Sequence, residues 1–207
     1  MDKYTIAFLG TDGSGKSTII MEITPIIEEK TGMIVRYEHM RPNYLPSLAV
    51  ALGKRSKDED FANGPVNNPH ASRPSGFIGS FLRLCYYLID YTYGYFRKIY
   101  LSRNTVWIFD RYYYDLLFDQ KRTRISLPKW MISMFGKIVP KPNVIICLGG
   151  EPDLIYSRKP ETSLEEVACQ VEALKSFCAA ESKAFWVDTT IDVKESICEV
   201  LKAIEIK

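Results

Sequence analysis

Residues 10–17 have the types and the spacing of a phosphate-binding loop. The pattern is Gly10-x-x-x-x-Gly15-Lys16-Ser17, within the stretch FLGTDGSGKSTII. Its glycines allow a tight turn that points backbone N–H groups at phosphate oxygens, and a helix starting at Lys16 would present its positive dipole end to the same anion. Lys16 can reach the terminal phosphates of a nucleoside triphosphate, and the Ser17 hydroxyl can coordinate Mg²⁺. The loop therefore predicts ATP and Mg²⁺ as ligands.

We expect the whole loop to contact the phosphate donor. The residues with this predicted role are Gly10, Asp12, Gly13, Ser14, Gly15, Lys16, Ser17 and Thr18. The alternative is a glycine-rich turn without function, but a strand-like run precedes the loop and a helical pattern follows it, as phosphate binding requires. Because such a loop is expected to be exposed, replacing Lys16 by alanine should abolish phosphoryl transfer and leave the fold intact.

A second acidic group is expected near the metal ion, at the end of a buried strand. The run TVWIFD ends in Asp110, and Arg111 follows it directly. A strand of this type that ends in aspartate pairs with the phosphate loop in such folds, so Asp110 joins Ser17 as a predicted metal-site residue. The alternative is an aspartate that caps the following turn.

Short apolar runs alternate with helical patterns along the chain. The expected strands span 4–9, 33–38, 105–110, 143–148 and 184–188, and the expected helices span 16–30, 76–102, 127–137, 152–159, 164–180 and 193–206. This alternation predicts an α/β protein with a five-stranded parallel sheet and helices on both faces, the P-loop NTPase fold. A length of 207 residues fits a single domain over 1–207.

Residues 41–75 interrupt the alternation with a stretch dense in Pro, Asn and Gly. A long irregular segment is either a functional loop or a partly disordered one. Its place after the second strand, at the carboxyl edge where open α/β sheets bind ligands, favours a loop on the acceptor side.

Composition excludes several classes of protein. The net charge of +2 is too small for a surface that binds nucleic acid throughout. Five cysteines without a C-x-x-C pair suit neither a disulfide framework nor a zinc site, so we expect reduced thiols and a cytoplasmic location. The most apolar long segment, 77–101, is interrupted by four charged residues and is not expected to span a membrane.

In order along the chain, these motifs resemble the thymidylate kinases, a family of P-loop nucleoside monophosphate kinases. FLGTDGSGKST resembles the start of the family, FDRYYYD (109–115) its Asp-Arg-Tyr motif, and VPKPNVIICLGGEPDLIYSRK (139–159) its Pro-Asp strand, Pro-Glu helix and arginine-bearing lid; MRPN (40–43) is a weaker match. The resemblance implies an ATP- and Mg²⁺-dependent phosphotransferase with a lid at about 157–163. The implied acceptor is a nucleoside monophosphate, with dTMP as the default.

The resemblance also implies roles for single residues. The catalytic set would be Lys16, Asp12, Asp110, Arg111 and Arg158. Asp12 would lie near the reacting end of the acceptor, and Arg111 and Arg41 would hold the acceptor phosphate, with Tyr112 beside them in the motif. Ser14 stands where some family members carry an arginine, which leaves Arg158, with Lys159 next to it, to supply the cation that closes on the transferring group.

The acceptor side departs from the family pattern. The place of the base-reading arginine falls at or near Asp90, and Arg83 lies two helical turns earlier on the same face. An aspartate suits sugar hydroxyls or an amino-bearing base better than a thymine carbonyl. The same donor chemistry on a sugar, sugar phosphate or glycolipid is therefore the alternative function, and a nucleotide-dependent switch or binding module is a second one.

Two further features have open interpretations. The expected helix over 77–101 is rich in aromatic residues, which favours core packing with a homodimer face over a platform for carbohydrate stacking. Lys121, Arg122 and Arg124 form a basic run. The run is either a set of solvated charges or a site for an additional anion on the acceptor.

Overall fold

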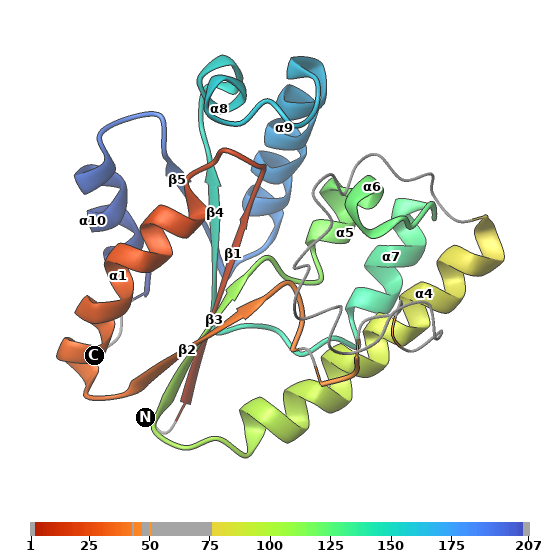
Figure 1. The fold of residues 1–207 in the computed structure, drawn as a ribbon, viewed down its shortest axis with the longest axis horizontal. Coiled ribbons are helices and arrows are strands. Elements are labelled where there is room, and N and C mark those ends of the chain that lie inside the picture. Colours follow the sequence, from red (N-terminus) through yellow and green to blue (C-terminus); the bar gives the residue numbers. More distant parts are fainter. Residues whose placement is uncertain (1–2, 43, 47–49, 51–75, 205–207) are drawn as a thin grey trace.

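Five parallel strands form one sheet with β1 at its centre in the computed structural model, which describes residues 3–42, 44–46, 50 and 76–204 (Figure 1). The order is β2-β3-β1-β4-β5. The strands are β1 (Lys3–Gly10), β2 (Ile34–His39), β3 (Thr105–Asp110), β4 (Val144–Gly149) and β5 (Ala184–Asp188). The predicted α/β P-loop NTPase fold and its parallel sheet are confirmed, and each strand lies within a residue or so of its expected range.

Helices cover both faces of the sheet. On one face, α1 (Lys16–Thr31) and α10 (Val193–Ile204) pack over Ile6 and Phe8 of β1. On the other face, Ala7 and Leu9 belong to a second core cluster that includes α9 (Leu164–Ala180) and α7 (Lys129–Gly136). Alternate residues of β1 thus enter different cores, which is why the strand is an apolar run without polar positions.

Three shorter helices lie near the carboxyl end of the sheet. They are α8 (Pro152–Arg158) and two one-turn helices, α5 (Asp115–Phe118) and α6 (Gln120–Thr123). The side chain of Ser163 caps α9 by accepting a hydrogen bond from the Glu166 N–H at 3.2 Å. The helices α5 and α6 were not predicted, because four residues are too few to show helical periodicity.

The expected helix over 76–102 is divided into two kinds of helix. It begins as α4 (Phe77–Ile89) and continues as a π-helix, η2 (Asp90–Tyr100). The segment around Tyr44 packs against η2 at Gly94. A Cβ added at Gly94 would lie only 2.8 Å from the Tyr44 Cβ. The absence of a side chain there permits this close approach.

Three further expectations from the sequence concern the segment 41–75, membrane-spanning helices and the cysteines. Most of the segment 41–75 lies outside the described residues, so its predicted role as a binding loop stays a prediction. Among the described residues, no helix is both long and apolar enough to cross a membrane. All five cysteines are described and are free thiols.

Candidate active site

The phosphate-binding loop joins β1 to α1 through backbone angles that glycine favours. Gly13 and Gly15 have φ values of 82° and 78°, in the left-handed region. At Gly13 a Cβ would also lie 2.5 Å from the carbonyl oxygen of Ile155. The loop therefore lies directly against α8, the helix that leads into the lid. These angles turn the chain sharply into α1, whose first residue is Lys16.

Lys16 is held in the loop by backbone carbonyl groups. Its Nζ donates hydrogen bonds to the carbonyl oxygens of Gly10 at 2.9 Å and Thr11 at 2.7 Å. The side chain is buried, and this burial lowers the pKa of Lys16 to about 8, with the nearby positive charge of Arg111 acting in the same direction. The ammonium therefore lies in the pocket with little surrounding water.

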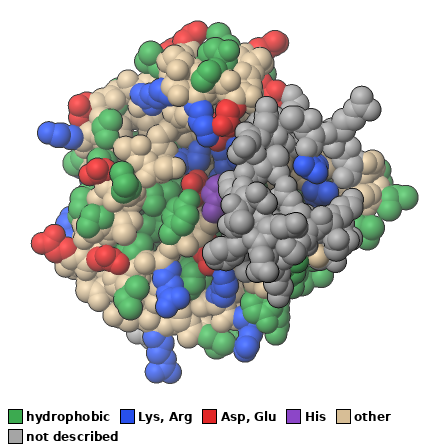
Figure 2. All heavy atoms as spheres, in the orientation of Figure 1, with side chains coloured by type: hydrophobic (Ala, Val, Ile, Leu, Met, Phe, Trp, Pro, Cys, Tyr) green, Lys and Arg blue, Asp and Glu red, His purple; other side chains and the backbone are tan. Residues whose placement is uncertain are grey.

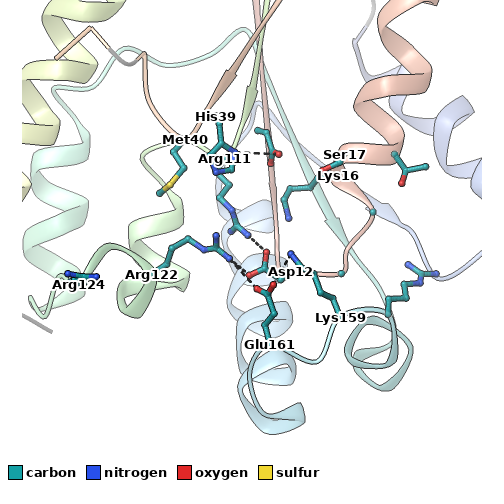
Figure 3. Close-up of a pocket in the computed structure, with 15 residues that line it drawn as sticks. Asp12, Lys16, Ser17, His39, Met40, Arg111, Arg122, Arg124, Lys159 and Glu161 are labelled. Carbon is teal, nitrogen blue, oxygen red and sulfur yellow. Dashed lines mark hydrogen bonds and ion pairs between the residues drawn. The ribbon is translucent and has the colours of Figure 1, made fainter. Parts of the chain in front are cut away.

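A cavity of about 750 Å³ opens at the carboxyl end of the sheet in front of this loop. Residues from five places in the chain line it: Asp12, Gly13, Gly15, Lys16, Ser17 and Thr18 from the loop and α1, His39 and Met40 after β2, Asp110 and Arg111 after β3, Arg122 and Arg124 around α6, and Arg158, Lys159 and Glu161 from the lid. Figure 3 shows several of these side chains converging on Asp12, and Figure 2 shows charged side chains gathered in the hollow beside a histidine. Six cations face three carboxylates, so the cavity suits anionic ligands.

Asp110, the predicted metal-site residue, lies in this cavity as a carboxylate. Its Oδ2 accepts a hydrogen bond from the Tyr37 hydroxyl at 2.9 Å, and Nδ1 of His39 lies 3.6 Å away. Burial raises the pKa of Asp110, but His39, Lys16 and Tyr37 together lower it to about 2. Oδ1 is buried and has no hydrogen-bond partner among the described residues.

Arg111 is almost completely buried and is surrounded by carboxylates. Its Nη2 lies 2.7 Å from Asp12 Oδ1, and its Nη1 lies 3.3 Å from the Gly10 carbonyl and 3.6 Å from Asp115 Oδ2. Burial alone would lower the pKa of Arg111, but Asp115 and Asp12 raise it overall. Burial raises the pKa of Asp115 to about 6 despite the opposing effect of Arg111. The backbone φ of 78° at Arg111 turns the chain so that this side chain points toward the loop.

Asp12 lies between two arginines. Besides Arg111 it pairs with Nη2 of Arg122, and Arg122 also contacts Asp119 at 3.2 Å and Glu161 at 4.0 Å. Burial raises the pKa of Asp12, but the two guanidinium groups more than offset this effect and hold it well below its usual range. The cluster links the phosphate loop, α6 and the lid through charges (Figure 3).

The lid segment adds cations to the far side of the cavity. Nη2 of Arg158 donates a hydrogen bond to the Thr189 carbonyl at 2.9 Å, and Lys159 forms an ion pair with Glu161 at 2.9 Å. Both Arg158 and Lys159 are exposed at the cavity wall. The geometry thus brings the lid residues to the same cavity as the phosphate loop.

Four residues predicted for the acceptor side do not line this cavity. Arg41 and the fully buried Asp90 pair with each other at 2.9 Å, and Asp90 also accepts a hydrogen bond from the Leu45 N–H at 2.7 Å. Arg83 donates to the Thr123 carbonyl at 3.1 Å. Tyr112 belongs to the core and donates its hydroxyl to the Pro140 carbonyl. These four side chains therefore contact other segments of the fold and do not face the cavity.

Other cavity residues were missed or left open by the sequence. His39 and Met40 follow β2 directly, and their place at the carboxyl edge of the sheet was the available signal. Arg122 and Arg124 belong to the basic run whose role was open, and the structure places both on the cavity wall. Glu161 has no distinguishing sequence pattern, and its proximity to Arg122 follows from folding alone.

Comparison with known proteins identifies the fold. No protein-family model matches the chain, and no curated protein sequence matches it. Among solved structures, thymidylate kinase from Ehrlichia chaffeensis is similar, with a TM-score of 0.60, 15% sequence identity and coverage of 100% of both chains. The chain therefore has a thymidylate kinase-like fold along its full length.

Proposed function

We propose that this protein is an ATP- and Mg²⁺-dependent phosphotransferase. The observation that supports the proposal best is the single cavity in which Lys16 of the phosphate loop, Asp110 and Arg111 face the lid. Phosphoryl transfer needs positioning and neutralisation of charge more than covalent help, and this cavity offers cations on several sides. Its volume of about 750 Å³ is in the range of sites for small organic ligands.

The donor side consists of the loop and the start of α1. Backbone N–H groups of the loop and Lys16 would hold the β- and γ-phosphates of ATP, with Ser17 and Thr18 at the helix terminus. The Lys16 ammonium donates to the Gly10 and Thr11 carbonyl groups and, at 3.3 Å, to the Ser14 hydroxyl, so a phosphate oxygen would replace one of these acceptors, the long contact to Ser14 first.

The affinity for ATP is expected to fall at alkaline pH. Burial lowers the pKa of Lys16 to about 8, and a bound phosphate would raise it because it stabilises the ammonium. Between these two pKa values the free protein must take up a proton on binding, so ATP affinity should weaken by up to about tenfold from about pH 7 to about pH 9. Calorimetric titration measures this, with Lys16→Arg as the matched variant, because its guanidinium stays charged and its affinity should not change with pH. A flat profile for the natural protein would contradict the role of Lys16.

The cavity fits a magnesium ion at Asp110 and Ser17. Mg²⁺ prefers oxygen ligands and keeps several water molecules, and the partnerless Oδ1 of the ionised Asp110 is a suitable acceptor for such an ion or its water. When bound, Mg²⁺ would neutralise charge between the phosphates. Asp110 and the Ser17 hydroxyl would hold it on the donor side of the cavity.

The transferring group would lie between Arg111 and the lid. Arg111 and Arg122 flank Asp12, and Arg158 with Lys159 line the cavity from the lid. Planar guanidinium groups bind phosphate oxygens in pairs, which orients the acceptor phosphate for in-line attack. Asp12 holds both arginines in place before the acceptor arrives.

A nucleoside monophosphate is the acceptor that we favour, with dTMP as the default. The similar solved structure is a thymidylate kinase, and the excess of cations in the cavity suits an acceptor that carries a phosphate. A sugar, sugar phosphate or glycolipid acceptor is the second candidate. It is favoured by Asp90, an acidic residue that stands where the family carries its base-reading arginine and that is paired with Arg41. A nucleotide-dependent switch is less well supported, because it has no need for the acceptor-side cations.

Release of ADP is the measurement that tests this function. The purified chain is incubated with ATP and Mg²⁺ and with each acceptor in turn: nucleoside monophosphates, simple sugars and sugar phosphates. Fast ADP formation with dTMP is expected. Formation only with sugars or sugar phosphates would move the acceptor to the second candidate, and ATP binding without turnover on any acceptor would favour the switch. The variant Asp110→Asn provides a control, because it removes a metal ligand and should suppress turnover with every acceptor.

We also propose a homodimer in the cytoplasm. Exposed apolar side chains follow one another along α4 and η2, among them Ile78, Leu82, Ile89, Phe96 and Tyr100. Such a stripe suits a self-complementary face between two copies of the chain. The five free thiols suit a reducing compartment. Sedimentation of the purified chain at the mass of a monomer at all concentrations would contradict the dimer.

A further inference from the structure

A second and much smaller cavity lies where the phosphate loop meets α5 and α9. Its volume is about 10 Å³. Its wall includes Thr11 at the start of the loop, Arg111, Asp115 of α5, and Gln170 and Leu174 of α9. None of the proposed steps at the large cavity uses Thr11 or Gln170.

Three of the residues that line this cavity each carry a buried polar atom that has no hydrogen-bond partner among the described residues. The atoms are Oγ1 of Thr11, Oδ2 of Asp115 and Nε2 of Gln170. The residues are only 5%, 4% and 7% exposed, so bulk solvent does not reach these atoms. A buried polar atom without a partner costs about 1–3 kcal/mol of stability. Three such atoms around one cavity indicate a shared partner inside it.

The size and the chemistry of the cavity fit one water molecule. A volume of about 10 Å³ is close to the smallest that holds a water. Water can accept a hydrogen bond from the Gln170 amide, donate one to the Asp115 carboxylate and share a third with the Thr11 hydroxyl. A metal cation fits poorly, because it would meet the amide N–H of Gln170 and the guanidinium of Arg111, whose Nη1 lies 3.6 Å from Asp115 Oδ2.

Two of the three polar residues contact the two cations that face the large cavity. The carbonyl oxygen of Thr11 accepts the hydrogen bond from Lys16 Nζ at 2.7 Å, and Asp115 is an ion-pair partner of Arg111. Gln170 belongs to α9, which packs against β4 and β5. A water that joins these residues would tie the start of the phosphate loop to a rigid helix.

We propose that this small cavity binds one internal water molecule, through which Gln170 and Asp115 position Thr11, and with it Lys16, for phosphate binding. The water site follows from the three polar atoms alone. Only its effect on nucleotide binding rests on the proposed phosphotransferase function.

A high-resolution crystal structure of the full chain tests the water site without any assay. One ordered water is expected within about 2.7–3.2 Å of all three atoms. Crystals of Gln170→Leu should lack this water or hold it with fewer partners. A direct hydrogen bond between Gln170 and Asp115 with no water between them, or a metal ion in the cavity, would overturn the proposal.

Calorimetric titration with ATP and Mg²⁺ tests the positioning role, at a temperature where every variant is folded. Gln170→Leu keeps the size of the side chain and removes its amide, and we expect ATP affinity to fall about fivefold because the loop is less well held. Thr11→Val should act in the same direction. The matched controls are Glu172→Leu, on the exposed face of α9, and Thr92→Val, whose hydroxyl donates to the Leu88 and Ile89 carbonyl groups in the preceding turn.

The outcomes of the titration separate the two hypotheses. Equal affinities of Gln170→Leu and Glu172→Leu, with normal ATP binding by the natural protein, would overturn the positioning role. A lower unfolding temperature of Gln170→Leu without a change in affinity would show a purely structural role, and would overturn it too. No ATP binding by the natural protein would contradict the proposed function, while the crystal structure would still decide the water site.

Discussion

Replacing Lys16 by alanine is expected to lower kcat for ADP formation by about 10²–10³-fold, the effect of removing one charge-stabilising donor from a preorganised site. The protein should stay folded. The lysine is buried, contrary to the exposed loop expected from the sequence, and its removal leaves the Gly10 and Thr11 carbonyl groups without this donor. That loss is opposed by a gain, because the variant no longer buries an ammonium ion, and burial of a charge is unfavourable and lowers the pKa of Lys16.

Steady-state ADP formation and thermal unfolding are the two measurements for this variant. Lys202→Ala is the matched control, because it removes the same charge from the exposed side of α10. Normal turnover in Lys16→Ala would exclude the phosphate loop from the mechanism. Loss of the folded state would mean that the hydrogen bonds from Lys16 to the two carbonyl groups stabilise the fold by more than the burial of its ammonium costs.

Replacing Arg111 by alanine is expected to reduce the free energy of unfolding by roughly 3–5 kcal/mol, as removal of one partner from a buried ion pair does. Arg111 is 3% exposed, and its loss would leave the buried Asp115 without this ion-pair partner and Asp12 with Arg122 alone. Alanine would also keep the unfavourable φ of 78°. The resemblance implies that Arg111 holds the acceptor phosphate, so weaker use of the acceptor is expected as well, and the buried surroundings of Arg111 add this larger effect on stability.

Urea unfolding measures the change, with Arg103→Ala as a control for loss of an exposed arginine. The double variant Arg111→Ala/Asp115→Asn should recover part of the lost stability, because it removes the uncompensated charge on Asp115. A loss below about 1 kcal/mol for Arg111→Ala is the size expected for an exposed ion pair, and it would contradict the structural importance of the pair between Arg111 and Asp115. ATP affinity of the folded variant then shows whether Arg111 belongs to the acceptor side alone.

The sheet and the position of the phosphate loop between β1 and α1 could be predicted because their signals are local. Each strand is a short apolar run, and the loop needs glycines at fixed spacing followed by Lys16 and Ser17, so a few adjacent residues carry the information. Asp110 was found for the same reason, since it ends a buried strand. These features depend on neighbours in the chain and not on how distant segments meet.

The acceptor side could not be predicted to the same extent because its contacts join distant segments. Asp90 is held by Arg41 across the fold, and Arg122 reaches Asp12 from α6. Neither pairing leaves a pattern in the sequence. The π-helix η2 is also unmarked, because hydrophobic spacing alone does not distinguish it from an α-helix over a few turns. Tyr112 resembled a site residue by its motif, but its ring fills the core.

The central place of β1 in the sheet determines when the phosphate loop can be completed during folding. The neighbours of β1 are β3 and β4, so that Lys3 pairs with Thr105 and Ile6 with Val144. Each of these ladders closes a long stretch of chain, which slows folding relative to local pairing. On the ribosome, β1 and its loop are made before both neighbouring strands, and β1 stays without β4 until residues 144–149 have been synthesised. The phosphate loop is therefore made before the two strands that flank β1 are available to hold it in place.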